Sequence, residues 1–346
     1  MIPSLTQTGF RIHEWDTEPL WEDFESDGPG EGEVLVDVEA CGVGLTVLNS
    51  IRGDLGNDPG LLPLVPGHEI VGRVSATGKG IDESLVGRRV AAYFYLVCGT
   101  CTECRRGQEP LCVNLAGFVG VHRDGGYAPN VVLPAGNAIP IPESLDPIAA
   151  TVIPDAVATP VHVAARAKIG KDDRVAVIGA GGGVGIHMVQ VAKLASPHVV
   201  GLDVNEPKLA AIESHGVRAI DSTDLTGLGA VFDNGPPTVI VDLLGSEPSA
   251  AWSVEALASG GRVVVLTTFR NRPLPIEYRR LVLGEISLLG SRYATKAEVG
   301  TAASLVETGR VRPVIGEAVG PATLLDLHTR LRAGELVGRG ALSWFD

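Results

Sequence analysis

Positive charge is scarce in this 346-residue chain, which has 28 Lys and Arg residues against 41 Asp and Glu residues. The net charge of -13 argues against nucleic acid or an anionic membrane as the main partner, because both bind concentrated positive charge. The N-terminal region lacks a charged segment followed by an apolar run, and we find no apolar stretch of about 18 residues. We therefore expect no signal peptide and no membrane span, and a cytoplasmic location.

Internal repeats and low-complexity linkers are also absent. Hydrophobic residues make up 45% of the chain and charged residues 20%, which is typical of an ordinary globular protein. The length is sufficient for two domains with a sizeable core.

The pattern of residue types along the chain changes near residue 154. Before it, Gly, Pro and short Val-containing runs such as 33–38 and 87–92 are typical of a largely β domain. After it, strand-like and helical segments alternate, which predicts a parallel, doubly wound sheet. The expected strands are 174–178, 199–203, 238–242 and 262–266, and the expected helices are 184–195, 207–215 and 296–307.

A glycine-rich turn follows the predicted strand 174–178. Alone it would also suit a flexible loop, but between a strand and a helix N-terminus it can bind a pyrophosphate through backbone N–H groups. Asp203 ends the next strand about 20 residues on, where an acid binds the ribose hydroxyls and repels a 2′-phosphate. We therefore predict an NAD(H) site at Gly179, Gly181, Gly182, Gly183, Val184, Gly185 and Asp203.

Four of the five cysteines lie in one short segment, as Cys98, Cys101, Cys104 and Cys112. Four thiolates can enclose a tetrahedral ion with no open position, which is typical of a structural zinc site. Disulfides are the alternative, but cysteines so close together in a reducing compartment favour metal.

These motifs, together with the triplet Gly67-His68-Glu69, resemble those of the zinc-type alcohol dehydrogenases of the medium-chain dehydrogenase/reductase superfamily. The resemblance covers essentially the whole chain. It implies an α/β fold: a mostly-β GroES-like catalytic domain (1–155 and 294–346, with the structural-zinc lobe at about 95–115) and a Rossmann domain with a doubly wound parallel sheet (156–293).

The resemblance also implies roles in the catalytic centre. His68 and Asp155 match two ligands of the catalytic zinc, and Glu69 matches the acid beside them. Thr46 matches the hydroxyl residue of the proton relay. Phe94 matches an aromatic wall of the substrate pocket, with ordinary core packing as the alternative.

Three further residues match cofactor contacts of the family. Thr159 occupies the position that packs on the nicotinamide, Lys208 matches the lysine at the adenosine ribose, and Arg339 matches an arginine at the cofactor phosphates. A solvated surface position is the alternative for both Lys208 and Arg339.

The chain departs from the family at one metal ligand. The family segment is C-G-V-C-x-[ST]-D, and its second cysteine binds zinc; here Gly44 stands at that cysteine and Val47 at the aspartate. Catalytic zinc usually needs three protein ligands, and His68 and Asp155 supply two. We therefore expect no catalytic zinc, unless Glu69, water or Cys41 completes the site.

Without a metal the expected chemistry changes. Glu69 and Asp155, converging with no cation between them, should repel each other and raise the pKa of one carboxyl group. A protonated Asp155 or a charged His68 could then act as a general acid on a substrate that is already electrophilic.

Three functions compete. The first is an NAD(H)-dependent oxidoreductase with a structural zinc and no catalytic zinc, acting on a fairly apolar alcohol, ketone or activated C=C or C=N substrate. The second is a conventional zinc alcohol dehydrogenase, and the third is a catalytically inactive NAD-binding protein. The retained Thr46, His68, Asp155 and Thr159 favour an enzyme. We expect a small-molecule substrate, and the resemblance implies a homodimer or homotetramer.

Overall fold

The computed structural model describes residues 4–267 and 276–345. The chain divides into two compact units. The first comprises Met1–Ala158, Ala294–Gly309 and Ile315–Asp346, and the second comprises Thr159–Tyr293 and Arg310–Val314. The catalytic and cofactor-binding roles given to the corresponding sequence ranges stay predictions.

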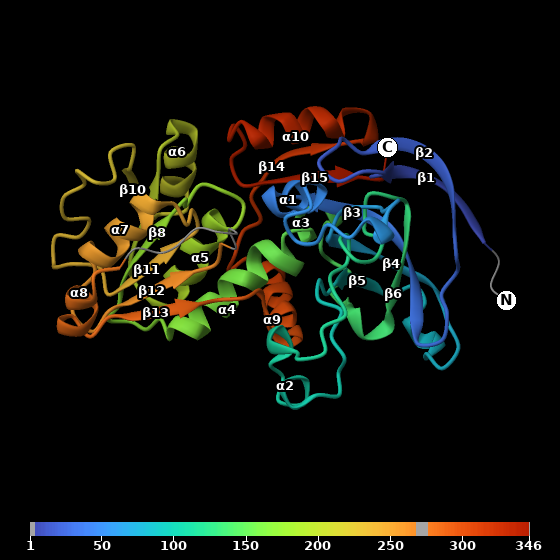
Figure 1. Cartoon of the computed structure of the whole chain (residues 1–346), viewed down its shortest axis with the longest axis horizontal. Coiled ribbons are helices and arrows are strands. Elements are labelled where there is room, and N and C mark those ends of the chain that lie inside the picture. Colours follow the sequence, from blue (N-terminus) through green and yellow to red (C-terminus); the bar gives the residue numbers. More distant parts are fainter. Residues whose placement is uncertain (1–3, 268–275, 346) are drawn as a thin grey trace. The chain divides into compact units, whose positions relative to one another are not determined.

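Antiparallel strands dominate the first unit (Figure 1). Its main sheet has the order β14-β15-β3-β4-β5-β7, β6 also pairs with β3, and β1 and β2 form a separate pair. The strands are β1 (Leu5–Arg11), β2 (Leu20–Ser26), β3 (Glu33–Val43), β4 (Glu69–Thr77), β5 (Arg89–Ala92), β6 (Asn130–Pro134), β7 (Ala138–Pro140), β14 (Ile315–Val319) and β15 (Arg339–Ser343). The helices are α1 (Leu45–Ile51), α2 (Thr102–Arg105), α3 (Pro147–Ala150), α9 (Lys296–Glu307), α10 (Leu324–Arg332) and the π-helical turn η5 (Ile153–Val157).

The register of this sheet brings three distant parts of the chain together. Gly42 of β3 pairs with Glu69 of β4 on one side and with Ala341 of β15 on the other. Val43 pairs with Gly340, so the residues that follow β3 lie close to Arg339 at the start of β15. Valines on β3, among them Val34 and Val36, lie in the core of the unit and hold this register in place.

The second unit contains the predicted parallel sheet. Its strand order is β10-β9-β8-β11-β12-β13, and every neighbouring pair is parallel. The strands are β8 (Arg174–Ile178), β9 (His198–Asp203), β10 (Arg218–Asp221), β11 (Val239–Asp242), β12 (Arg262–Val265) and β13 (Ser287–Gly290). The helices are α4 (Ala158–Ala167), α5 (Gly185–Ala195), α6 (Glu206–Ser214), α7 (Glu247–Ala256) and α8 (Tyr278–Leu283). The predicted fold class is confirmed. The strands and helices that the sequence predicted in this unit begin and end within one residue of the observed ones, whereas β10, β13, α4, α7 and α8 were not predicted.

Alternation along β8 divides the core of this unit into two layers. Val175 and Val177 pack with α4 and α5, whereas Ala176 and Ile178 face the opposite side, where Trp252 of α7 packs. Successive side chains of a strand point to opposite faces, so a strand covered on both sides must be apolar throughout, as β8 is.

One part of the chain differs from the sequence-based expectation about membranes. The run Pro147–Ala167 is helical over 21 residues and apolar enough to cross a bilayer by length and composition. Within its most apolar window 61% is buried inside the protein, as in the core helix of a soluble protein. The run is therefore weak evidence for a membrane span.

The helix α9 supports the turn that carries Asp155, because it packs directly against η5. Thr295 begins this helix with a capping box: its hydroxyl accepts the Glu298 N–H at 3.2 Å, and the Glu298 carboxylate accepts the Thr295 N–H at 2.7 Å. The cap satisfies two backbone groups that the helix itself leaves unpaired.

We predict that Thr295→Ala lowers the free energy of unfolding by about 1 kcal/mol, since an N-cap hydroxyl contributes about that much. Thr301→Ala is the matched control, because Thr301 is exposed in the middle of the same helix and alanine is a good helix former. Chemical denaturation of the two variants measures the difference, and equal stabilities would contradict the prediction.

Candidate functional site

The four predicted catalytic residues come from three places in the first unit. Thr46 lies on α1, Glu69 begins β4 with His68 just before it, and Asp155 lies in the π-helical turn η5.

Gly67 directly precedes His68. Its φ is +96°, and a side chain there would also meet the Tyr127 ring at 2.6 Å. The glycine of the Gly-His-Glu triplet is thus required by both backbone conformation and space.

His68 and Asp155 come together as the sequence predicts. The Nε2 atom of His68 lies 3.5 Å from Oδ2 of Asp155, and the His68 side chain is 2% exposed. Among the described residues, this buried Nε2 atom has no hydrogen-bond partner. Phe94 packs beside the His68 ring, with the ring centroids 4.4 Å apart. Phe94 is buried, as core packing requires, and its part in a substrate pocket stays a prediction.

Arg339 joins this group, which the sequence analysis did not foresee. Its Nε donates to Oε2 of Glu69 at 2.7 Å, and its Nη2 donates to Oε1 of Glu69 at 2.6 Å. The same Nη2 also donates to Oδ2 of Asp155 at 3.1 Å. Arg339 is 5% exposed and Glu69 is fully buried, so the pair is a bidentate ion pair shielded from water.

The expected repulsion between Glu69 and Asp155 is wrong, because Arg339 is the cation that contacts both. Burial by itself would lower the pKa of Arg339, but the ion pairs with Glu69 and Asp155 outweigh it and raise that pKa above its usual value. The guanidinium therefore stays charged. With this cation in place, the reason for expecting a protonated Asp155 no longer holds.

Gly44 contacts the same guanidinium. A Cβ atom placed on Gly44 would lie 2.3 Å from Cζ and Nη1 of Arg339 and 2.8 Å from Nε. The sequence shows that a cysteine is missing at position 44. It does not show that the Arg339 guanidinium lies there, because this contact depends on the pairing of β15 with β3, which are far apart in the chain.

As arranged, these residues do not supply a complete zinc site. His68, Glu69 and Asp155 have donor atoms within 4.8 Å of one another. However, both Glu69 oxygens accept hydrogen bonds from Arg339, Gly44 has no donor, and a positive charge lies 3.1 Å from Asp155 Oδ2. His68 and Asp155 remain, one ligand short of the usual three. Cys41 is fully buried with its pKa raised, first by burial and then by Glu69, which disfavours the thiolate that zinc needs.

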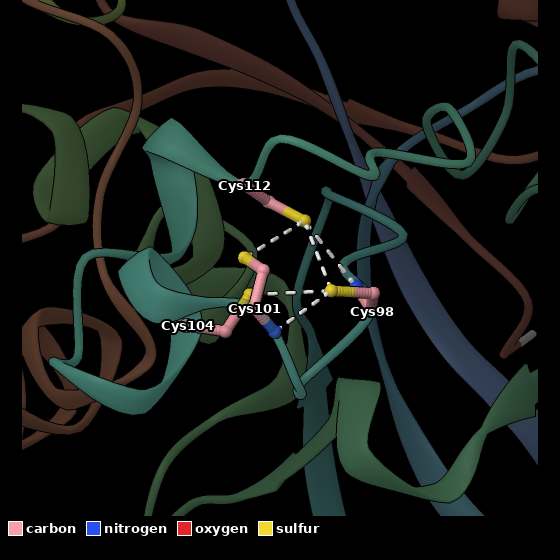
Figure 2. A group of neighbouring side chains, drawn as sticks. All are labelled: Cys98, Cys101, Cys104 and Cys112. Carbon is pink, nitrogen blue, oxygen red and sulfur yellow. Dashed lines mark hydrogen bonds between the residues drawn. The ribbon is translucent and has the colours of Figure 1, made fainter.

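The four-cysteine lobe fits a metal ion well. Figure 2 shows the four side chains turned toward one another, with Sγ atoms 3.6 Å apart for Cys98 and Cys112 and 4.0 Å apart for Cys98 and Cys104. Four thiolates about 2.3 Å from a tetrahedral zinc would be separated by about 3.8 Å. All the cysteines are free, so the disulfide alternative is wrong.

Local hydrogen bonds prepare this lobe for a cation. Backbone N–H groups, first that of Thr100 and then that of Cys101, lower the pKa of Cys98 to about 5. Backbone hydrogen bonds, led by that of Cys104, also lower the pKa of Cys101. The thiolate is the form that binds zinc, so these bonds favour that form at Cys98 and Cys101, whereas burial raises the pKa of Cys104.

All the predicted cofactor residues except Arg339 lie in the second unit, where β8 lies between β9 and β11. This is the point at which the strand order reverses, the usual place for a ligand in a doubly wound sheet. Asp203 at the end of β9 accepts the Gly181 N–H at 2.9 Å, and α5 starts after Val184 without a side-chain cap. The Ile186 N–H in this first turn already donates to the Gly182 carbonyl oxygen at 2.9 Å, so a phosphate here would rely on the other N–H groups of the turn and on the helix dipole.

Two glycines keep this turn compact. A Cβ atom on Gly185 would lie 2.1 Å from the Gly179 carbonyl oxygen, and one on Gly181 would lie 2.3 Å from the Cβ atom of Lys208. Lys208 therefore packs on the glycine turn, next to Asp203. Thr159 belongs to the same unit, whereas Arg339 belongs to the first. Their contacts with the cofactor stay predictions.

Comparison with known proteins agrees with this geometry. Residues 30–143 match the model of the alcohol dehydrogenase GroES-like domain, and residues 183–308 match that of the zinc-binding dehydrogenases. The chain is 33% identical to an alcohol dehydrogenase of Geobacillus stearothermophilus over 89% of this chain and 91% of that one. The chain belongs to the zinc-type alcohol dehydrogenase family.

Two further relatives are named for different substrates. Acryloyl-coenzyme A reductase of Metallosphaera sedula is 28% identical over 84% of this chain and 86% of its own length. The structure of acetophenone reductase from Geotrichum candidum in complex with NAD has a TM-score of 0.85 at 27% identity, covering 99% and 98% of the two chains. The predicted oxidoreductase class, NAD(H) and structural zinc are confirmed at the level of the family.

We predict that Cys98→Ser removes the structural zinc and lowers the melting temperature, because a structural metal contributes its binding free energy to folding. Cys41→Ser is the matched control, since Cys41 lies outside the lobe. Zinc content by mass spectrometry and thermal denaturation of both variants measure the effect. Retention of zinc by Cys98→Ser would contradict the assignment.

We also predict that Asp203→Asn raises the Kd for NADH by about 10- to 100-fold, since a hydrogen bond to a charged group is worth about 1.5–3 kcal/mol. The preference for NADH over NADPH should fall as well, because the charge that repels the 2′-phosphate is lost. Asp221→Asn, at the exposed end of the neighbouring strand β10, is the control. Fluorescence titration measures both, and unchanged affinities would contradict the role of Asp203.

Proposed function

We propose that this protein is an NAD(H)-dependent oxidoreductase that transfers hydride without a catalytic zinc. Its substrate is a fairly apolar ketone or alcohol, or a compound with an activated C=C or C=N bond. The observation that carries the proposal is the contact of Arg339 with Gly44, Glu69 and Asp155, which leaves a zinc ion two ligands.

The need for an activated substrate follows from the missing metal. Zinc polarises a carbonyl group or lowers the pKa of a bound alcohol, and an unassisted ketone gains neither effect here. A conjugated C=C bond accepts hydride at one carbon while its electrons move onto a neighbouring acceptor group, and a proton completes the reduction. NADH, when bound, supplies the hydride. The relative named acryloyl-coenzyme A reductase supports such a substrate class, and the acetophenone reductase supports an apolar ketone.

Residues of this chain would transfer the proton and contact the apolar part of the substrate. The hydroxyl of Thr46 and the imidazole of His68 are candidates to carry the proton, with Asp155 orienting His68 at 3.5 Å. Phe94 and Phe118 stack with centroids 5.0 Å apart and give an apolar surface beside His68. Such a surface favours an uncharged substrate over a charged one.

A conventional zinc alcohol dehydrogenase is the second candidate. The Nε2 of His68, which has no hydrogen-bond partner in residues 4–267 and 276–345, lies 3.5 Å from Asp155 Oδ2, a separation that two ligands of one zinc ion would have. In that case Glu69 would have to leave Arg339 and bind the metal.

We further propose a homo-oligomer formed through the second unit. Strand β13 lies at the edge of the parallel sheet, and α8 precedes it with Tyr278, Val282 and Leu283 strongly exposed. Apolar side chains beside an open sheet edge suit a second copy of the same chain. A cytoplasmic location fits the free thiols of the zinc lobe.

Metal analysis of protein purified without added zinc should give about one zinc per chain, the number that the cysteine lobe can hold. A panel of enones, imines and aryl ketones should then support NADH oxidation, because the chain retains the residues proposed for NADH binding and for proton transfer.

Two outcomes would change the assignment. Two zinc ions per chain, with activity lost on chelation, would favour the conventional zinc enzyme. NADH binding with no turnover of any substrate in the panel would favour an inactive NAD-binding protein.

A further inference from the structure

Two buried side chains of α5 hold a segment of chain that joins two parts of the first unit. This crossing segment, Arg310–Val314, belongs to the second unit, whereas α9 before it and β14 after it belong to the first. His187 is fully buried and Gln190 is 7% exposed. Residues three positions apart lie on the same face of a helix, so one face of α5 carries both contacts to the crossing segment.

The hydrogen bonds of His187 define where its ring proton lies. The Val314 N–H donates to Nε2 of His187 at 3.1 Å, so Nε2 carries no proton. The proton of the neutral ring therefore lies on Nδ1, which donates to the Gly183 carbonyl oxygen at 2.6 Å. A single imidazole thus joins the glycine turn to the crossing segment.

Gln190 fixes the crossing segment at a second residue. Its Oε1 accepts the Arg312 N–H at 2.8 Å, and its Nε2 donates to the Arg312 carbonyl oxygen at 3.0 Å. The amide pairs with Arg312 much as a neighbouring strand would. The crossing segment is therefore bound to α5 by both side chains, in a place that is largely shielded from water.

The contact with Gly183 orients a peptide group of the predicted pyrophosphate site. The carbonyl of Gly183 and the N–H of Val184 belong to one trans peptide and point in opposite directions. His187 holds the carbonyl from one turn further along α5, so the Val184 N–H points out of the helix, toward the end where a phosphate binds. An N–H that donates to a phosphate also makes the carbonyl of its own peptide a stronger acceptor.

From Val314 the chain leads directly to the buried acids of the first unit. The next residue, Ile315, pairs with Arg339 in the register of β14 and β15. Arg339 in turn donates hydrogen bonds to Glu69 and Asp155. Each of these noncovalent contacts lies within one unit, and the peptide bond between Val314 and Ile315 connects the two sets.

We propose that His187 is a positioning residue that couples NAD(H) binding to the acids predicted to be catalytic. A bound pyrophosphate fixes the peptide between Gly183 and Val184, and His187 passes this restraint to Val314 and the start of β14 beside Arg339. Binding that restrains one site leaves less motion to be lost at the other, and the effect is reciprocal. This inference rests on the proposed NAD(H)-dependent function.

Amide hydrogen exchange with and without NADH tests the coupling, and it needs no substrate. In the unaltered protein, saturating NADH should slow exchange in the glycine turn, in residues 310–319 and in residues 339–343. Exchange slows where a hydrogen bond opens less often, so the pattern reports which parts of this route the cofactor restrains.

Asparagine and glutamine at position 187 separate the two hydrogen bonds of the ring. The amide of His187→Asn reaches the position of Nδ1, so it can bind Gly183 but not Val314. This variant should change the Kd for NADH by less than about 2-fold, because the glycine turn keeps its hydrogen bond. The slowing of exchange in residues 310–319 should be lost.

The amide of His187→Gln reaches the position of Nε2, so it can bind Val314 but not Gly183. This variant should raise the Kd for NADH by about 2- to 10-fold, the effect of one neutral hydrogen bond. At saturating NADH the slowing of exchange in residues 310–319 should be lost here too. A merely structural histidine would give no such division between affinity and exchange.

Met188→Leu is the matched control. Met188 is fully buried in the apolar core of the same unit and lies next to His187 on α5. The substitution nearly conserves volume, so it is well tolerated. It should keep both the affinity for NADH and the slowed exchange in residues 310–319.

The inference is wrong if NADH protects the glycine turn but not residues 310–319 in the unaltered protein. That result decides the matter even if the His187 variants fail to fold. It is equally wrong if folded His187→Asn keeps the NADH-dependent slowing in residues 310–319. Failure of the unaltered protein to bind NADH would instead refute the proposed function on which the inference rests.

Discussion

Arg339 carries its charge where water cannot solvate it, and the carboxylates of Glu69 and Asp155 are what stabilise it there. Removing one partner of a buried ion pair typically costs about 3–5 kcal/mol, because the other charge is left without compensation. The positions of Glu69 on β4, of Asp155 on η5 and of Arg339 on β15 are therefore coupled. The site behaves as one electrostatic unit rather than as a set of separate side chains.

The framework around this unit is built from ordinary elements. The sheet register brings Gly42, Glu69 and Ala341 side by side, and the capped helix α9 packs against the turn that carries Asp155. A buried charge cluster tolerates little displacement, since each hydrogen bond weakens steeply as its geometry departs from the optimum. The apolar core of the first unit and the capping of α9 therefore serve the site as well as the fold.

Features carried by short stretches of sequence could be predicted. The glycine turn after β8, Asp203 at the end of β9 and the four cysteines each depend on spacing within about twenty or thirty residues, which fixes local geometry. The replacement of the zinc-binding cysteine by Gly44 could also be predicted, because it can be read directly from the sequence. The parallel sheet followed from alternating strands and helices, and its central strand β8 from the apolar run 174–178.

What lies opposite Gly44 could not be predicted. Arg339 stands 270 residues after Glu69, and their contact depends on β15 pairing with β3, a long-range register that no local pattern specifies. For the same reason the sequence suggested a repulsion between Glu69 and Asp155 that the fold removes. The neighbours of Gly44 are therefore set by the fold and not by the adjacent sequence.

The absence of a side chain at Gly44 also bears on which substitutions this part of the molecule can accept. A Cβ atom at position 44 would meet the Arg339 guanidinium at 2.3 Å, so a larger residue there requires that side chain to move. Because the same guanidinium donates hydrogen bonds to Glu69 and Asp155, its movement would rearrange both carboxylates. A substitution just before α1 would in this way be felt on β4 and in the turn η5.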